Sequence, residues 1–215
     1  MEENKMERLT KKIRINTTLE LLTGLHIGGS SDNIEIGGID SPVIKLKDGV
    51  PYIPGSSLKG KIRCLLEQKA GKGLCKDEKV NSLFGNNDNK NPLPSKVIFR
   101  DAYLTKESFT MLKNSEYLSM PFTELKAENS IDRLGGKATN PRFTERIPAG
   151  AKFDVEFVIN VWDNDNEQEF KQMLKEGIAL LENDYLGGSG SRGYGQVKFS
   201  ELKETELSDK NNWGV

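Results

Sequence analysis

Residues 153–161 read Phe-Asp-Val-Glu-Phe-Val-Ile-Asn-Val. Large apolar side chains occupy every second position, and the residues between them are polar or smaller. Because successive side chains of a strand point to opposite faces of a sheet, this alternation predicts a half-buried strand. The next segment, Glu167–Asn183, carries apolar residues at helical spacing and predicts an amphipathic helix. Its predicted buried stripe consists of Phe170, Met173, Leu174, Ala179, Leu180 and Leu181.

The first half of the chain repeats this order of strand and helix. Residues 11–22 alternate with period two and predict a strand. After a long loop, Ser56-Ser57 offers an N-cap for a helix from Leu58 to about Lys69. Its predicted buried stripe consists of Leu58, Ile62, Leu65 and Leu66.

Two further strands, predicted at residues 97–103 and about 194–202, complete a βαββαβ order. This order predicts an α+β fold with a ferredoxin-like (RRM-like) core. Many RNA-binding domains share that core, and so do many unrelated proteins, so the architecture alone gives no function.

We expect a single domain over residues 1–215 with two long insertions. Residues 70–95 are polar and rich in Lys, Asn and Gly, which predicts a mobile insertion. Residues 121–147 contain two extended arms around Asp132–Lys137, which predicts a protruding hairpin, here called the thumb. The core is expected to span about residues 11–69, 96–104 and 152–202.

Composition limits the possible classes of protein. The 31 basic and 32 acidic residues give a net charge of −1, which argues against coating nucleic acid through bulk charge. A local basic groove remains possible. Cys64 and Cys75 are too far apart for a CxxC site, so two thiols in a reducing cytoplasm are expected. No apolar run approaches the ~20 residues of a membrane span, and Met1–Lys5 lacks a secretory apolar stretch. We therefore expect a cytoplasmic protein without a membrane partner.

The strongest local signal is the glycine-rich loop, residues 187–195, between the second helix and the last strand. Five glycines in nine residues expose backbone N–H groups, and Arg192 adds a cation, so the loop could wrap a phosphate backbone. The alternative is a flexible linker. A Rossmann turn is disfavoured, because that turn follows a strand and opens a helix.

A second signal lies at the start of the first helix, in Ile53–Arg63. The free N–H groups of a helix start favour an anion, and Lys59 and Arg63 would extend the positive site by one turn. Seen alone, the segment is equally compatible with an ordinary capped helix carrying solvated lysines.

Together these segments resemble the RAMP superfamily of CRISPR proteins, and within it the backbone subunits of type III-A (Csm) effector complexes. The resemblance covers nearly the whole chain, from the first strand to Phe199. The stretches that carry it are Gly24–Gly29, Ile39–Lys45, Pro54–Gly60, Leu83–Gly85, Phe99–Ala102 and Asp184–Gly188.

The resemblance implies a subunit that polymerises head-to-tail along CRISPR RNA, together with other subunits of the complex. It implies endonucleolytic cleavage of single-stranded target RNA at regular intervals, with the thumb displacing a nucleotide of the guide–target duplex. The implied catalytic carboxylate is Asp40, acting as general base or as a ligand of Mg²⁺, the expected cofactor. The RNA-contacting residues would be His26, Ser56, Ser57, Lys59, Arg63, Arg133, Gly187, Gly188, Ser189, Gly190, Ser191, Arg192 and Gly193.

Three alternatives remain open at this stage. From composition alone, Asp40 before Ser41-Pro42 would be a structural Asx turn. The chain could also be a non-catalytic RNA-binding scaffold, or a guide-processing nuclease that uses His26, its sole histidine, as base. Glu124, Glu128 and Asp132 in the thumb could assist a metal, although a solvated hairpin is the simpler reading.

Overall fold

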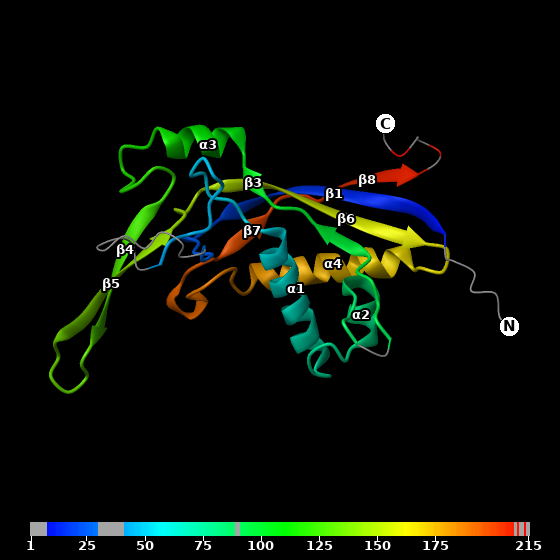
Figure 1. Cartoon of the computed structure of the whole chain (residues 1–215), viewed down its shortest axis with the longest axis horizontal. Coiled ribbons are helices and arrows are strands. Elements are labelled where there is room, and N and C mark those ends of the chain that lie inside the picture. Colours follow the sequence, from blue (N-terminus) through cyan, green and yellow to red (C-terminus); the bar gives the residue numbers. More distant parts are fainter. Residues whose placement is uncertain (1–7, 30–40, 89–90, 209, 211–212, 214–215) are drawn as a thin grey trace.

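The computed structural model describes residues 8–29, 41–88, 91–208, 210 and 213. A six-stranded sheet forms the body of the molecule, and a two-stranded hairpin projects from one end of it (Figure 1). The expected α+β class is therefore confirmed.

Two long strands form the centre of the sheet. β1 (Leu9–Leu21) pairs antiparallel with β6 (Lys152–Trp162) along nearly its full length, with Ile13 opposite Ile159. β2 (Val97–Phe99) pairs with the outer side of β6, and β7 (Val197–Phe199) with the outer side of β1. The order β7-β1-β6-β2, with all neighbours antiparallel, is the 4-1-3-2 order of a ferredoxin-like sheet.

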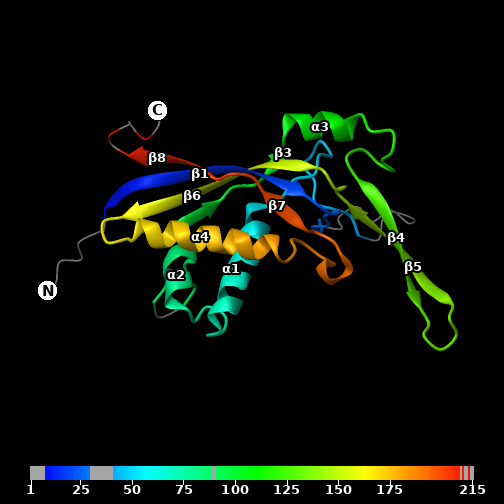
Figure 2. The same ribbon diagram turned by 180° about the vertical axis from the view of Figure 1, so that it is seen from behind.

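Two long helices cover one face of this sheet (Figure 2). α1 (Gly55–Ala70) and α4 (Glu167–Glu182) bury Leu58, Ile62 and Leu174 in one apolar core with the inward residues of β1 and β6. The two helices approach closely at Gly177, where a Cβ atom would lie 2.5 Å from Cγ2 of Ile62. The stripe of α4 therefore runs through Gly177 and Ile178, and Ala179 is exposed, contrary to expectation.

The segment expected to be a mobile insertion contains a helix, so that prediction is wrong. α2 (Glu78–Phe84) is capped by the side chain of Asp77, which accepts a hydrogen bond from the N–H of Val80. Val80, Leu83 and Phe84 are buried in the core. Three apolar anchors fix the helix, although the surrounding residues are polar.

Two other expectations are refined. The strand expected at 97–103 is divided into β2 and β3 (Tyr103–Leu104), and a further helix, α3 (Lys106–Lys113), follows. Of the last expected strand, about 194–202, the structure forms β7, and a further strand, β8 (Lys203–Ser208), lies beyond it and pairs with β1. The polar C-terminal segment therefore belongs to the sheet.

The expected thumb is confirmed. β4 (Glu124–Ile131) and β5 (Ala138–Arg146) form an antiparallel pair that extends away from the sheet (Figure 1). Its base is joined to the body, because Ile147 forms a bridge with Leu25. Across the described residues, no helix is long and apolar enough to cross a membrane.

Candidate nucleic-acid interface

The glycine-rich loop is packed against the segment that follows β1. The N–H of Gly188 donates to the carbonyl oxygen of His26 at 2.8 Å, and the N–H of Gly195 donates to that of Gly24 at 3.0 Å. Gly187 and Gly195 have φ of +75° and +71°, and a Cβ on Gly187 would lie 2.3 Å from the His26 carbonyl oxygen. The glycines thus permit close packing, and the loop is a fixed element rather than a flexible linker.

The outer part of this loop faces solvent. A short 3₁₀ turn, η1 (Gly190–Arg192), places Ser191, Arg192 and Gly193 at the surface. Ser189 sits in the left-handed region at φ +61°, and its Oγ accepts a hydrogen bond from Arg192 at 2.5 Å. The loop therefore presents a rigid backbone and one exposed guanidinium.

His26 links this loop to the base of the thumb. Its Nδ1 lies 2.7 Å from the carbonyl oxygen of Glu145, while its own carbonyl oxygen accepts from Gly188. His26, Gly187 and Gly188, expected from the sequence to act together, are brought together by the structure.

Glu145 organises the same corner and was not identified from the sequence. Its side chain is fully buried and accepts hydrogen bonds from Lys45 Nζ at 2.5 Å, Thr123 Oγ1 at 2.6 Å and the Val43 N–H at 2.9 Å. A buried carboxylate requires such partners. Its position in a strand of alternating polarity gives no sign of burial, because the partners come from distant segments.

The segment that follows Asp40 is anchored at this corner. The carbonyl oxygen of Ser41 accepts from the Glu145 N–H at 3.1 Å, and that of Pro42 accepts from the Gly29 N–H at 3.1 Å. Asp40 itself lies outside the described residues. Its sequence neighbour Ser41 is therefore held beside the base of the thumb. Ser41 and His26 both contact the backbone of Glu145.

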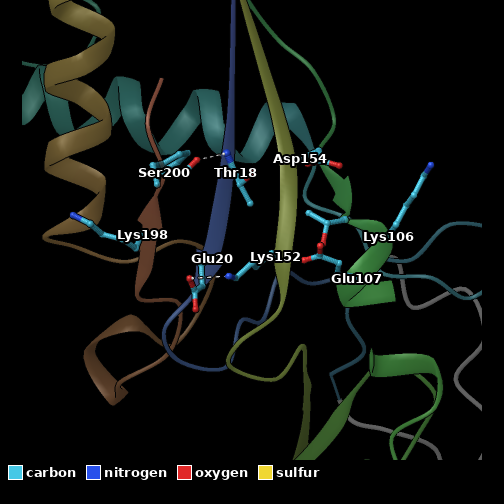
Figure 3. Close-up of a pocket in the computed structure, with 10 residues that line it drawn as sticks. Thr18, Glu20, Lys106, Glu107, Lys152, Asp154, Lys198 and Ser200 are labelled. Carbon is cyan, nitrogen blue, oxygen red and sulfur yellow. Dashed lines mark hydrogen bonds and ion pairs between the residues drawn. The ribbon is translucent and has the colours of Figure 1, made fainter. Parts of the chain in front are cut away.

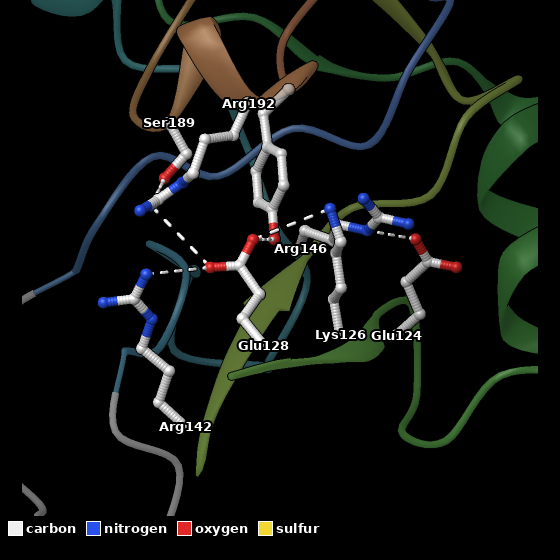
Figure 4. Close-up of polar contacts among 8 residues, drawn as sticks. Glu124, Lys126, Glu128, Arg142, Arg146, Ser189 and Arg192 are labelled. Carbon is white, nitrogen blue, oxygen red and sulfur yellow. Dashed lines mark hydrogen bonds and ion pairs between the residues drawn. The ribbon is translucent and has the colours of Figure 1, made fainter. Parts of the chain in front are cut away.

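A cluster of charges joins the thumb to the glycine-rich loop (Figure 4). Glu128 of β4 accepts from the Tyr194 hydroxyl at 2.9 Å and from Arg142 Nη2 at 3.2 Å. Lys126 Nζ and Arg192 Nη2 lie 3.6 and 3.8 Å from its oxygens. Burial alone would raise the pKa of Glu128, but the Tyr194 bond and the nearby cations outweigh it and hold that pKa below its ordinary value.

The rest of the thumb contributes further cations that the sequence reading did not single out. Arg146 forms an ion pair with Glu124 at 2.5 Å and lies over the ring of Tyr194, 5.1 Å from its centroid. Gly24 makes room for this arginine, because a Cβ there would lie 2.5 Å from its Cδ. Arg142 and Arg146 are four positions apart and so share one face of a strand, and this spacing is the signal that could have identified them.

Arg133 lies in the tip of the thumb, apart from the cluster at its base. The tip residues are exposed, and the turn is held by a hydrogen bond from the Leu134 N–H to Asp132 Oδ1 at 3.0 Å. Asp132 thus stabilises its own turn, while Glu124 and Glu128 are paired with cations.

The start of α1 differs from the expected capped helix. The N-cap is Pro54, and Ser56 and Ser57 lie within the first turn, so the Ser56–Ser57 cap prediction is wrong. The N–H of Gly55 instead donates to Asp101 Oδ1 at 2.8 Å, a partner 46 positions away. Ser56 is exposed and Ser57 half-buried, so both lie at a helix start that can still face an anion.

Lys59 and Arg63 are less available than expected. Arg63 donates to Glu67 at 2.8 Å and to Asn81 at 3.0 Å, and its Nη2 lies 3.3 Å from the Cys75 sulfur. Lys59 Nζ donates to Ser95 at 2.7 Å. Burial, reinforced by the charge of Arg63, lowers the pKa of Lys59. Arg63 is therefore mainly a structural link to the 70–95 segment.

The expected RNA-contacting residues fall into two groups. Ser56, Lys59 and Arg63 border shallow hollows lined by residues 84–87, 93–95 and 97–99. His26 and the glycine-rich loop form the other group, with the thumb. Lys61 connects α1 to the second group, since its Nζ lies 3.0 Å from Asp184 and 3.7 Å from the centroid of the Tyr185 ring.

The described residues contain no cluster of three His, Cys, Asp or Glu side chains able to hold a metal ion. The carboxylates of Glu124, Glu128 and Glu145 are engaged by cations instead. The described residues therefore provide no preformed set of protein ligands for Mg²⁺.

A hollow of about 720 Å³ lies elsewhere, on the sheet face opposite α1 and α4 (Figure 3). Acidic and basic side chains alternate along it, as in the pair of Lys152 with Glu20 at 3.6 Å. This balanced charge does not favour a polyanion, so the interface at the glycine-rich loop remains the candidate site.

Comparison with known proteins identifies the family of this chain. The model of the RAMP superfamily matches residues 18–198. Two proteins named CRISPR system Cms endoribonuclease Csm3 are each 45% identical to the chain. The one from Methanocaldococcus jannaschii aligns over 92% of this chain and 83% of its own length, and the one from Streptococcus thermophilus over 91% and 90%.

Solved structures show the same likeness. A structure of the Csm3–Csm4 subcomplex of the type III-A CRISPR–Cas interference complex matches with a TM-score of 0.64 and 35% identity, covering 97% of this chain and 86% of that one. A type III-B Cmr-beta complex bound to cognate target RNA matches with a TM-score of 0.65, 90% of this chain and 61% of that one. At 18% identity, the second match shows the fold alone.

Proposed function

Because this chain belongs to the RAMP superfamily, we propose that it is a CRISPR RNA-binding backbone subunit of a type III-A interference complex and an endoribonuclease that cuts target RNA. The observation that carries this proposal is the 45% identity, over more than nine-tenths of the chain, to proteins named Csm3 endoribonucleases. The Csm3–Csm4 match supports membership of a multisubunit complex.

The partners follow from the same argument. Guide RNA and single-stranded target RNA are the proposed ligands, and further copies of this chain and other type III-A subunits are the proposed protein partners. Head-to-tail stacking of copies would repeat the thumb at a fixed spacing, which accounts for cleavage at regular intervals. The exposed Leu134 and Ile131 at the thumb tip are suited to contact a neighbouring copy.

The proposed RNA interface consists of the glycine-rich loop, His26 and the base of the thumb. The Arg192 guanidinium, held on a rigid backbone, can bind a phosphate oxygen without a large ordering cost, whereas the N–H groups of Gly188, Gly193 and Gly195 already donate within the protein. Ser56, Ser57 and Lys59 at the start of α1 are proposed as a second contact for the strand through their side chains, because the Asp101 carboxylate already accepts from the Gly55 N–H. Arg133 at the thumb tip is proposed to contact RNA at the neighbouring subunit.

The chemistry requires little from the protein, because RNA carries its own nucleophile. A thumb that unstacks one nucleotide can rotate a 2′-oxygen into line with its phosphorus. Asp40 is the proposed general base for that hydroxyl. The 2′-oxygen then bonds to phosphorus as the 5′-oxygen leaves, which yields a 2′,3′-cyclic phosphate and a 5′-hydroxyl. The Glu145 N–H binds the carbonyl oxygen of Ser41 and so anchors the residue that directly follows Asp40. This anchoring supports the proposed role of Asp40.

We propose Mg²⁺ as the cofactor. Mg²⁺ retains several waters and is commonly held by one or two carboxylates together with substrate phosphates, so it requires no protein cage. Asp40 is the carboxylate that could serve, and the ion would supply charge stabilisation at the phosphate. Loss of cleavage in EDTA and recovery on adding Mg²⁺ would support this proposal.

The deciding experiment uses the reconstituted complex and labelled target RNA. Asp40→Ala should lower the cleavage rate by at least about 100-fold, the range of a lost general base, while assembly and target binding persist. Asp48→Ala is the control, since Asp48 is an exposed acid of the neighbouring loop that accepts a hydrogen bond from the Val50 N–H.

Two results would contradict the proposal. If the unmodified complex leaves target RNA intact with and without EDTA, the chain is a binding scaffold. If Asp40→Ala abolishes assembly, Asp40 is structural.

A further inference from the structure

The Glu128 carboxylate occupies the centre of a ready-made anion site (Figure 4). Oε2 lies 3.2 Å from Arg142 Nη2 and 3.8 Å from Arg192 Nη2, while Oε1 accepts from Tyr194 and lies 3.6 Å from Lys126 Nζ. These four donors come from both thumb strands and from the glycine-rich loop. Each of them could equally bind a phosphate oxygen, which accepts charge-assisted hydrogen bonds in the same way as a carboxylate.

The strengths of these contacts differ. The Arg142 and Arg192 side chains are about half exposed, at 49% and 50%, so solvent screens their attraction to Glu128. Tyr194 is buried, at 1% exposure, and its hydroxyl bond is shielded. The two arginines can therefore leave the carboxylate while the tyrosine retains it.

We infer that the Glu128 carboxylate competes with RNA for Arg142 and Arg192. In the free chain the carboxylate holds both arginines, and a phosphodiester group of the RNA displaces it. This inference rests on the proposed function. In the free chain, Glu128 links the thumb weakly to the glycine-rich loop. In the RNA-bound chain, one phosphate would bind Arg142 of the thumb and Arg192 of the loop instead. The carboxylate would thus weaken the binding of stray RNA, which is why a chain of net charge −1 can keep a basic site without coating nucleic acid.

The test measures single-stranded RNA binding to the full chain by fluorescence anisotropy over a range of salt concentrations. Glu128→Gln keeps an oxygen acceptor for Tyr194 and removes the charge. We expect affinity to rise about three- to tenfold. The slope of log K against log salt should steepen by up to about 0.7, the contribution of one phosphate contact on a single strand.

Glu156→Gln is the matched control. Glu156 also lies within 4.0 Å of two arginines, Arg14 and Arg100, but faces the opposite side of the sheet from α1 and α4. The change in net charge is identical, so an effect of bulk charge would appear equally in both variants. We expect the affinity of Glu156→Gln to stay within about twofold of wild type.

A second measurement isolates Arg192. Arg192→Gln should lower affinity more in the Glu128→Gln background than in the wild type, because only there is the guanidinium free before binding. Unchanged affinity in Glu128→Gln, or an equal rise in Glu156→Gln, would overturn the inference while leaving RNA binding intact. If neither wild type nor any variant binds RNA, the proposed function fails and the inference fails with it.

Discussion

Gly187 and Gly195 bracket the glycine-rich loop, and both have positive φ beside a backbone carbonyl. The sequence showed where glycines gather but not why, because their neighbours, His26 and Leu186, are identified only by the fold. The same limit applies to Arg63: it was expected to face a ligand, yet it contacts Asn81 and Cys75. At the scale of single residues, composition located the site and the distant partners decided its detail.

Gly195→Ala should therefore destabilise the protein strongly. Its φ is +71°, and the added Cβ would lie 1.9 Å from the Leu186 carbonyl oxygen, so strain and overlap act together. We expect the free energy of unfolding to fall by about 3 kcal/mol in urea denaturation. Gly193→Ala is the control, because φ is +86° but no atom lies within 4 Å, and it should cost only about 1 kcal/mol. Equal losses would show that the close packing of Gly195 is unimportant.

Secondary-structure elements were predicted well where periodicity is long. β1 and β6 alternate over more than ten residues, and α4 follows a sustained stripe, so these elements lie where expected. α2 was missed because its apolar anchors are only three in a polar segment. The wrong cap for α1 has another cause: Asp101, far along the chain, binds the Gly55 N–H. Short elements and non-local caps depend on tertiary contacts that periodicity does not encode.

The attachment of β8 to α4 should depend on pH. Side-chain hydrogen bonds from Lys171 and Lys175 hold the pKa of Glu204 below its ordinary value. A carboxylate whose pKa is lower in the folded state stabilises fully above its unfolded pKa of about 4.3 and loses that contribution as pH falls through the folded value. Glu204→Gln should cost about 1 kcal/mol at pH 7.

The difference between Glu204→Gln and wild type should shrink in urea denaturation as pH falls through the folded pKa of Glu204, below which the carboxylate is protonated in both states. Glu201→Gln, at an exposed position three residues earlier, serves as the control and should match wild type across this range. A difference that persisted in acid would mean that Glu204 stabilises through packing rather than charge.

The whole molecule consists of a packed body and a thumb whose outer half is exposed. The tip carries apolar side chains that bury nothing within the chain: Leu134 is fully exposed and Ile131 is 69% exposed. The sequence predicted both parts and their order. It could not show that the base of the thumb, His26 and the segment after Asp40 meet at Glu145, because three stretches distant in sequence converge there.

Leu134→Ser should weaken assembly without changing the thermal stability of the chain. Since this side chain is fully exposed, we expect the melting temperature to change by less than about 2 °C. If the tip contacts a neighbouring copy, assembly on guide RNA should weaken about tenfold or more, as measured by native mass determination. Leu74→Ser removes another leucine, 72% exposed and far from the thumb in sequence, and should change neither property. Normal assembly of Leu134→Ser would exclude the tip as an adhesive contact.

β1 and β6, the two longest strands of the sheet, both lie in its interior, each with a hydrogen-bonded neighbour on either side. The outer strands among the described residues are short, and β8 carries the charged residues Lys203, Glu204 and Glu206. Such borders discourage the edge-to-edge strand pairing that leads to amyloid-like growth. If copies of this chain stack as proposed, these borders would keep them from fusing into one continuous sheet.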